Sequence, residues 1–320
     1  MQNVENSRYL YPAASHEDEQ ELFAMEMRAL FGVEARNGYV IIDKNVDPSR
    51  SPFLRGRLDV ILTAEDPAGI AEQVANAVQL DGQTFKVTFV SGGLAFDEQR
   101  AAEKEIGWRI HGQADMRYPD RLFGVAHVQG RYWFGEYVKS EPMWLKHNDK
   151  PQPYSTALGT RVARAVANIA VPDIRAGVRA IDPCCGIGTV LIEARSMGID
   201  MIGYDLNPLA LKGARINLAH FGMPDVVKRA DMTLLEPGED GPFDAAVLDL
   251  PYNLCSVLPD EERLAMLRSA RRLADKVVIV TTEPIDEAIS QAGLRITDRC
   301  TVRKGKFQRQ VIACESDGGS

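Results

Sequence analysis

The second half of the chain alternates short apolar runs with amphipathic segments. The apolar runs, typical of buried parallel strands, cover residues 178–181, 201–204, 226–230, 243–248 and 277–280. Between them, apolar residues recur at three- and four-residue intervals, which predicts helices over 189–197, 209–221, 261–273 and 285–291. Two further strands follow at 294–302 and 307–314 with no helix between them. This order predicts the α/β class: a doubly wound, Rossmann-like parallel sheet with an antiparallel last strand.

The first half of the chain has a less regular pattern. It predicts helices over 17–30 and 70–80 and around 102–110, and strands over 39–42, 84–90, 122–128 and 131–138. Prolines 151 and 153 lie in a stretch of mixed charge, so we expect a linker at 141–155, with Trp144 exposed. We therefore expect a small region at 1–65, an α+β region at 66–140 and the sheet domain at 156–320.

Composition and charge limit the possible classes of protein. The chain has 320 residues, 45% of them hydrophobic, which fits a multidomain globular protein. The sequence has no apolar run near the roughly 18 residues of a membrane span and no secretory signal pattern at residues 1–6. Its five cysteines, two of them adjacent, do not suit a secreted disulfide framework, so we expect a cytoplasmic protein without membrane association.

The net charge of −8 argues against a protein that simply coats nucleic acid. Two windows run against this average. Residues 131–179 carry eight basic and four acidic side chains, and residues 295–309 carry six and one. A polyanion would bind at these windows, unless their charge is only solvated surface.

Acidic residues follow the first three strands of the regular half. The first strand leads into residues 182–189, Asp-Pro-Cys-Cys-Gly-Ile-Gly-Thr, where Gly186 and Gly188 allow a sharp turn and close ligand approach. The third glycine of a dinucleotide fingerprint is replaced by Leu191, and a phosphate-binding P-loop motif does not occur. A carboxylate at Asp182 favours a ligand with a positive end, such as the sulfonium and ammonium groups of S-adenosylmethionine.

The next two strands extend this pattern. Asp205, 23 residues beyond Asp182, suits ribose hydroxyls, and Asp231 with its apolar neighbour suits the adenine amine and ring. We expect no metal there, because adjacent cysteines coordinate metals poorly. The alternative is that Asp182 and Asp205 only cap turns. The predicted cofactor-binding residues are Asp182, Cys184, Gly186, Gly188, Thr189, Asp205, Leu206, Asp231 and Met232.

The fourth strand leads into Asp249-Leu250-Pro251-Tyr252. This segment resembles the (Asp/Asn)-Pro-Pro-(Tyr/Phe) motif of class I S-adenosylmethionine-dependent methyltransferases that methylate amines. The resemblance implies that Asp249 and the backbone at Pro251 accept hydrogen bonds from the amine, and that Tyr252 stacks on a base. Leu250 replaces the usual proline, which we expect to loosen the turn. A plain strand-to-turn connection or a degraded site is the alternative.

A longer resemblance includes residues 150–158, which read Lys-Pro-Gln-Pro-Tyr-Ser-Thr-Ala-Leu, the helix after them and the Asp182-Pro183 loop. Together these are similar to the tRNA guanosine-N2 methyltransferases that carry a THUMP domain. Residues 66–137 resemble THUMP, and residues 1–65 would correspond to a ferredoxin-like domain. The resemblance implies methylation of guanosine N2 in tRNA or another structured RNA, with the N-terminal module docked on the acceptor end. The alternatives are an amine on DNA, protein or a metabolite, or a cofactor-sensing or RNA-binding subunit.

Overall fold

The computed structural model describes residues 8–35, 38–154, 157–238, 242–251, 258–304 and 307–316. The chain divides into two compact units. The first contains Met1–Ala14, Glu34–Ser49 and Phe53–Glu141, and the second contains Ser15–Val33, Arg50–Pro52 and Pro142–Ser320. None of the helices in the described part of the chain has the length and apolar character needed to cross a membrane.

The first unit is built on a mixed sheet with strand order β2-β1-β3-β6-β5-β4. Helices α2 and α3 pack on one face of it, where Ile70 and Ile106 meet Phe123 and Phe134 in a buried cluster. β1 pairs with both β2 and β3, and β3 pairs with β6, so strands from before and after residues 65 and 66 share one sheet. The domain boundary expected at residues 65 and 66 stays a prediction. The ferredoxin-like and THUMP-like assignments stay predictions. The elements are β1 (Tyr9–Pro12), β2 (Tyr39–Ile42), β3 (Gly56–Ala64), α2 (Pro67–Ala77), β4 (Phe85–Gly92), α3 (Phe96–Gly107), β5 (Arg121–Val128) and β6 (Arg131–Lys139).

The second unit contains the predicted Rossmann-like sheet. Its strand order is β12-β13-β11-β10-β7-β8-β9, and β13 runs antiparallel to both of its neighbours. The strands are β7 (Arg179–Asp182), β8 (Asp200–Asp205), β9 (Val227–Arg229), β10 (Phe243–Asp249), β11 (Ala274–Thr281), β12 (Leu294–Lys304) and β13 (Phe307–Ser316). The doubly wound sheet with an antiparallel last strand is therefore confirmed.

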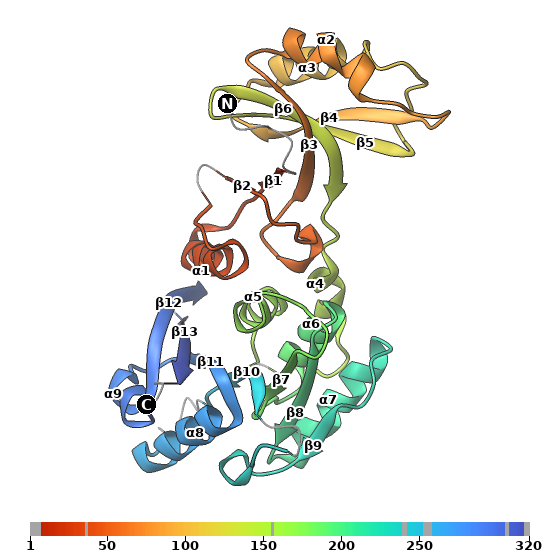
Figure 1. Cartoon of the computed structure of the whole chain (residues 1–320). Coiled ribbons are helices and arrows are strands. Elements are labelled where there is room, and N and C mark those ends of the chain that lie inside the picture. Colours follow the sequence, from red (N-terminus) through yellow and green to blue (C-terminus); the bar gives the residue numbers. More distant parts are fainter. Residues whose placement is uncertain are drawn as a thin grey trace. The chain divides into compact units, whose positions relative to one another are not determined.

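Helices cover both faces of this sheet. α5, α6 and α7 pack side by side in that order, whereas α8 and α9 pack together against β10, β11 and β12 (Figure 1). The bounds are α1 (Gln20–Phe31), α4 (Met143–Lys146), α5 (Thr160–Ala170), α6 (Thr189–Ser196), α7 (Pro208–His220), α8 (Asp260–Leu273) and α9 (Asp286–Gln291). Short 3-10 helices cover Glu17–Glu19, Pro48–Arg50, His147–Asp149 and Met232–Leu234.

The segment expected to be a linker contains α4 and a 3-10 helix, and its Trp144 is buried, so the expectation of an exposed tryptophan is wrong. The reason is a cation–π contact: the Arg164 guanidinium lies 5.7 Å from the centre of the Trp144 ring. Trp144 thus helps to pack the helices of the second unit.

Helix α1 belongs to the second unit although it lies near the start of the sequence. It packs on α5 and β12. Its Glu26 carboxylate is fully buried and accepts hydrogen bonds from Ser51 Oγ at 2.5 Å and Asn168 Nδ2 at 2.7 Å. Arg28 pairs with Asp298 at 2.8 Å. These polar contacts fasten residues 15–33 and 50–52 to the sheet domain.

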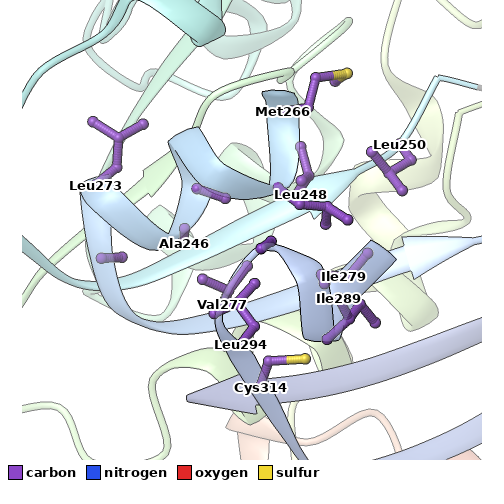
Figure 2. Packing of buried hydrophobic residues seen from close by; sticks show 14 of the residues in the cluster. Ala246, Leu248, Leu250, Met266, Leu273, Val277, Ile279, Ile289, Leu294 and Cys314 are labelled. Atoms are coloured by element: carbon purple, nitrogen blue, oxygen red, sulfur yellow. The ribbon is translucent and has the colours of Figure 1, made fainter. Parts of the chain in front are cut away.

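A hydrophobic cluster holds the middle of this sheet. Figure 2 shows Ala246 and Leu248 of β10 and Val277 and Ile279 of β11 packed with side chains of α8 and α9. Leu250, directly after β10, belongs to the same cluster and is 4% exposed. The cluster therefore fixes the end of β10, where Asp249 lies.

Candidate active site

The carboxyl ends of β7, β8 and β10 surround a cavity of about 810 Å³. Parallel strands of an open sheet end at one edge, which is where such folds bind ligands. Gly188 lies just behind the lining as the N-cap of α6, and Tyr252 lies outside the described residues. Ten of the twelve predicted site residues line the cavity: Asp182, Cys184, Gly186, Thr189, Asp205, Leu206, Asp231, Met232, Asp249 and Pro251.

The loop after β7 takes a conformation that depends on its glycines. Gly186 has φ 55° and Gly188 has φ 80°, both in the left-handed region that favours glycine. A Cβ built on Gly186 would meet nothing within 4 Å, so the backbone there faces open space. Cys185 N donates to Tyr204 O at 2.8 Å and ties the loop to β8. The loop is thus held open beside the cavity.

The carboxylates after β8 and β9 fix their own turns as well as lining the cavity. Asp205 accepts hydrogen bonds from Gly186 N and Asn207 N, both at 2.8 Å. Asp231 accepts from Thr233 N at 2.9 Å and from its hydroxyl at 2.7 Å. Asp205 therefore does cap its turn, as the alternative interpretation of this residue requires. Each carboxylate oxygen has two acceptor sites, so capping leaves room for a ligand's donors.

Asp182 and Cys184 lie deeper. Asp182 is 3% exposed, and its carboxylate accepts from Cys184 N at 3.3 Å. Burial, with the neighbouring charges of Asp249 and Asp205, raises the pKa of Asp182 well above its usual range. Burial and the surrounding aspartates also raise the pKa of the Cys184 thiol. Cys184 therefore stays a thiol, unsuited to nucleophilic attack or metal binding.

Asp249 ends β10 and faces the same cavity. Its Oδ1 atom is buried and has no hydrogen-bond partner among the described residues. Burial raises the pKa of Asp249 to about 7, and the charge of Arg309 opposes that rise. A buried acceptor without a partner points to a donor supplied by a ligand.

Leu250 extends the sheet pairing of β10, whereas the turn that we expected it to loosen continues into residues outside the described part of the chain, so that expectation stays a prediction. Its backbone N donates to Val280 O at 3.0 Å, so sheet pairing continues one residue beyond β10. Its side chain is buried in the cluster of Figure 2. A proline at this position would lack the N–H that makes the bond.

The charges around the cavity restrict what it binds. Among the described lining residues none is Lys, Arg or His, whereas the acidic ones are Asp182, Asp205, Asp231, Asp249 and Glu262. Such walls repel a pyrophosphate and attract cations and hydrogen-bond donors. Thr189 Oγ1 is a second buried polar atom without a partner in the described structure. This donor and acceptor set fits the ammonium, sulfonium, ribose hydroxyls and adenine amine of S-adenosylmethionine.

Part of the cavity lining was not predicted from the sequence. Tyr154, 63% exposed, and Leu158 form one wall, and Glu262 and Met266 of α8 form another. Residues 154 and 158 lie in the segment that carried the longer resemblance, which is the signal that could have found them. The position of α8 beside the cavity depends on packing that the sequence pattern does not encode.

Comparisons with known proteins agree with this geometry. Residues 148–278 match the RMKL-like methyltransferase domain. A tRNA (guanine(10)-N2)-dimethyltransferase of Methanothermobacter thermautotrophicus is 34% identical over 232 residues, which cover 67% of this chain and 68% of that protein. Its namesake from Pyrococcus abyssi is also 34% identical, over 51% of this chain.

The share of each relative's own length that the alignment covers differs. The alignment spans half of the Pyrococcus protein. The human U6 snRNA (guanine-N(2))-methyltransferase THUMPD2 is 28% identical over 57% of this chain and 38% of its own length. Among solved structures, TrmN from Thermus thermophilus is similar at a TM-score of 0.49 and 21% identity, covering 97% of this chain and 99% of TrmN.

Proposed function

The chain belongs to the RMKL-like methyltransferase family, and from this premise we propose that it transfers a methyl group from S-adenosylmethionine to N2 of a guanosine in tRNA. The guanosine and the tRNA come from the names of the two archaeal relatives. The observation that carries the chemistry is the buried, unpartnered Asp249 Oδ1 at the end of β10, in a cavity with acidic walls.

The residues at the ends of β7, β8 and β9 would hold the cofactor. Asp182 and the backbone at Cys184 would hold its amino-acid end, Asp205 its ribose, and Asp231 with Met232 its adenine. When bound, S-adenosylmethionine supplies an electrophilic methyl carbon on a sulfonium. Among the described lining residues no cation competes with that positive charge.

Asp249 would prepare the attacking amine. The lone pair of guanosine N2 is delocalised into the ring, which makes the amine a poor nucleophile. An ionised Asp249 accepts one N2–H bond, and the Pro251 carbonyl provides a second acceptor, so that the lone pair points toward the methyl group. Asp249 would take the N2 proton that is released as the methyl group passes from the sulfonium to N2, with the S–C bond breaking and S-adenosylhomocysteine left as the product. Stacking of the base on Tyr252 stays a prediction, because Tyr252 lies outside the described residues.

The contribution of the first basic window is smaller than its charge suggests. Arg164 is 2% exposed and pairs with the buried Glu193 at 2.8 Å. It therefore stabilises the contact between α5 and α6 and offers no charge to RNA. Docking of the N-terminal unit on the tRNA acceptor end stays part of the proposal.

Nucleoside mass spectrometry of tRNA, from cells with and without this gene, tests the proposal. We expect N2-methylated guanosine to be lost with the gene and restored by the wild-type chain but not by Asp249→Ala. Asp244→Asn, at the other end of the same strand, is the matched control and should restore it. Calorimetry should show that Asp249→Ala still binds S-adenosylhomocysteine. Unchanged guanosine modification in the deletion strain, or rescue by Asp249→Ala, would contradict the proposal.

A further inference from the structure

The proposed chemistry needs Asp249 in its charged form, yet its surroundings oppose that form. Its Oδ1 atom is buried, which disfavours a charge there. A carboxyl group that is already protonated cannot take up the proton that leaves the amine. Burial opposes ionisation of this carboxyl, and the cavity that it faces has acidic groups from several neighbouring elements. The titratable groups that share the cavity with Asp249 are Asp182 after β7, Cys184 in the glycine loop, Asp205 after β8, Asp231 after β9 and Glu262 on α8.

Arg309 of β13 provides a positive charge that the cavity walls lack. Asp249 pairs with Val280 of β11, and Val280 pairs with Val311 of β13, so these three residues share one rung of the sheet. Residues on one rung point to the same face, and so do residues two apart on a strand. Arg309 is two residues from Val311 on β13, so it lies on the same face of the sheet as Asp249 and nearer to the edge at which β10 ends.

The distance is within reach of a long side chain. β11 alone separates β10 from β13, which places the two backbones about 10 Å apart. Arg309 is half-buried, and burial lowers the pKa of its guanidinium, a shift that the charge of Asp249 opposes. In turn, the charge of Arg309 opposes the rise that burial causes in the pKa of Asp249. Its guanidinium also lies 5.0 Å from the centre of the Phe307 ring, which restricts its movement.

We propose that Arg309 is a positioning residue that holds Asp249 in its charged, proton-accepting form for the attacking amine. The proposal rests on the proposed function for the identity of the amine. Arg309 lies beyond residues 148–278, the part of the chain that matches the family. Arg309 also belongs to the basic segment at residues 295–309, and under this proposal its charge acts on Asp249 and not on RNA phosphates.

Titration of the Asp249 carboxyl tests the proposal without cofactor or RNA. In protein labelled with carboxyl-¹³C aspartate, the Asp249 resonance is assigned by its loss in Asp249→Asn. We expect a midpoint near pH 7 in the wild type. In Arg309→Gln it should rise by roughly one pH unit, while Arg309→Lys keeps most of the wild-type value. Arg303→Gln is the matched control, because Arg303 lies on β12 next to the Val302 that pairs with Arg309 and so points to the opposite face.

The pH profile of single-turnover methyl transfer gives the second readout. In Arg309→Gln the pH at which the rate rises should increase by the same amount as the Asp249 midpoint. At pH values above that new midpoint, the rate should approach the wild-type value. A uniform loss at every pH, or an unmoved carboxyl midpoint in a folded Arg309→Gln, would overturn the proposal. If the midpoint moves but wild-type protein transfers nothing to tRNA, Arg309 keeps its role and the proposed function fails.

Discussion

Removing the carboxylate of Asp205 should weaken cofactor binding with little effect on folding of the sheet. Asp205 ends β8, lines the cavity and already accepts from Gly186 N and Asn207 N at 2.8 Å. Its oxygens still offer acceptor sites to two ribose hydroxyls. A hydrogen bond to a charged group is worth about 1.5–3 kcal/mol. Discounting for water that replaces the lost contacts, Asp205→Ala should cost about 2–4 kcal/mol, or a Kd increase of roughly 30-fold to almost 1000-fold.

Isothermal titration calorimetry with S-adenosylhomocysteine measures this change directly. Asp200→Ala is the matched control, because Asp200 begins the same strand at the opposite edge and its side chain pairs with Arg195 on the surface. Its Kd should equal the wild-type value. If Asp205→Ala binds within about threefold of wild type, or Asp200→Ala weakens binding as much, Asp205 does not hold the ribose.

Three further predictions concern stability, measured by denaturant unfolding. Burial raises the pKa of Glu26 to about 7. As pH rises, the Glu26 carboxyl therefore ionises at lower pH in the unfolded state than in the folded state. The free energy of unfolding of the wild type should fall by about 3 kcal/mol relative to that of Glu26→Gln between pH 4 and pH 8; a difference between the two proteins that does not change with pH would contradict this. Glu193→Ala removes the carboxylate that balances the charge of the buried Arg164 and should cost about 3–5 kcal/mol; a cost below about 1 kcal/mol would refute it. Leu250→Pro restores the family motif but removes the bond to Val280 O, so it should destabilise by about 1–3 kcal/mol; an unchanged or higher stability would show that this bond is not needed.

The sheet of the second unit was predictable because its central strands β7, β10 and β11 are largely buried and appear as short apolar runs. β3 (Gly56–Ala64) was missed, and the structure shows why. A register shift between Val60 and Leu62 breaks the alternation by which a half-buried strand is recognised. That α1 belongs to the second unit could not be predicted either, because it depends on contacts such as the Arg28–Asp298 pair, which joins residues 270 positions apart.

The acidic residues after β7, β8, β9 and β10 could be predicted as a site because parallel strands end at one edge. The role inferred for Arg309 could not. It depends on β13 lying between β11 and β12, an order that long-range pairing decides. Trp144 illustrates the same limit: its mixed-charge neighbourhood in sequence suggested exposure, whereas its contact with Arg164 buries it.

The most direct test of the account is transfer of a deuterated methyl group in vitro. Purified chain, S-adenosylmethionine carrying a CD₃ group and unmodified tRNA are incubated, and the tRNA is digested to nucleosides for mass spectrometry. We expect label on guanosine as an N2-methyl or N2,N2-dimethyl group, and none with Asp249→Ala. Label on another base, or tRNA that stays unlabelled while wild-type chain binds S-adenosylhomocysteine, would contradict it.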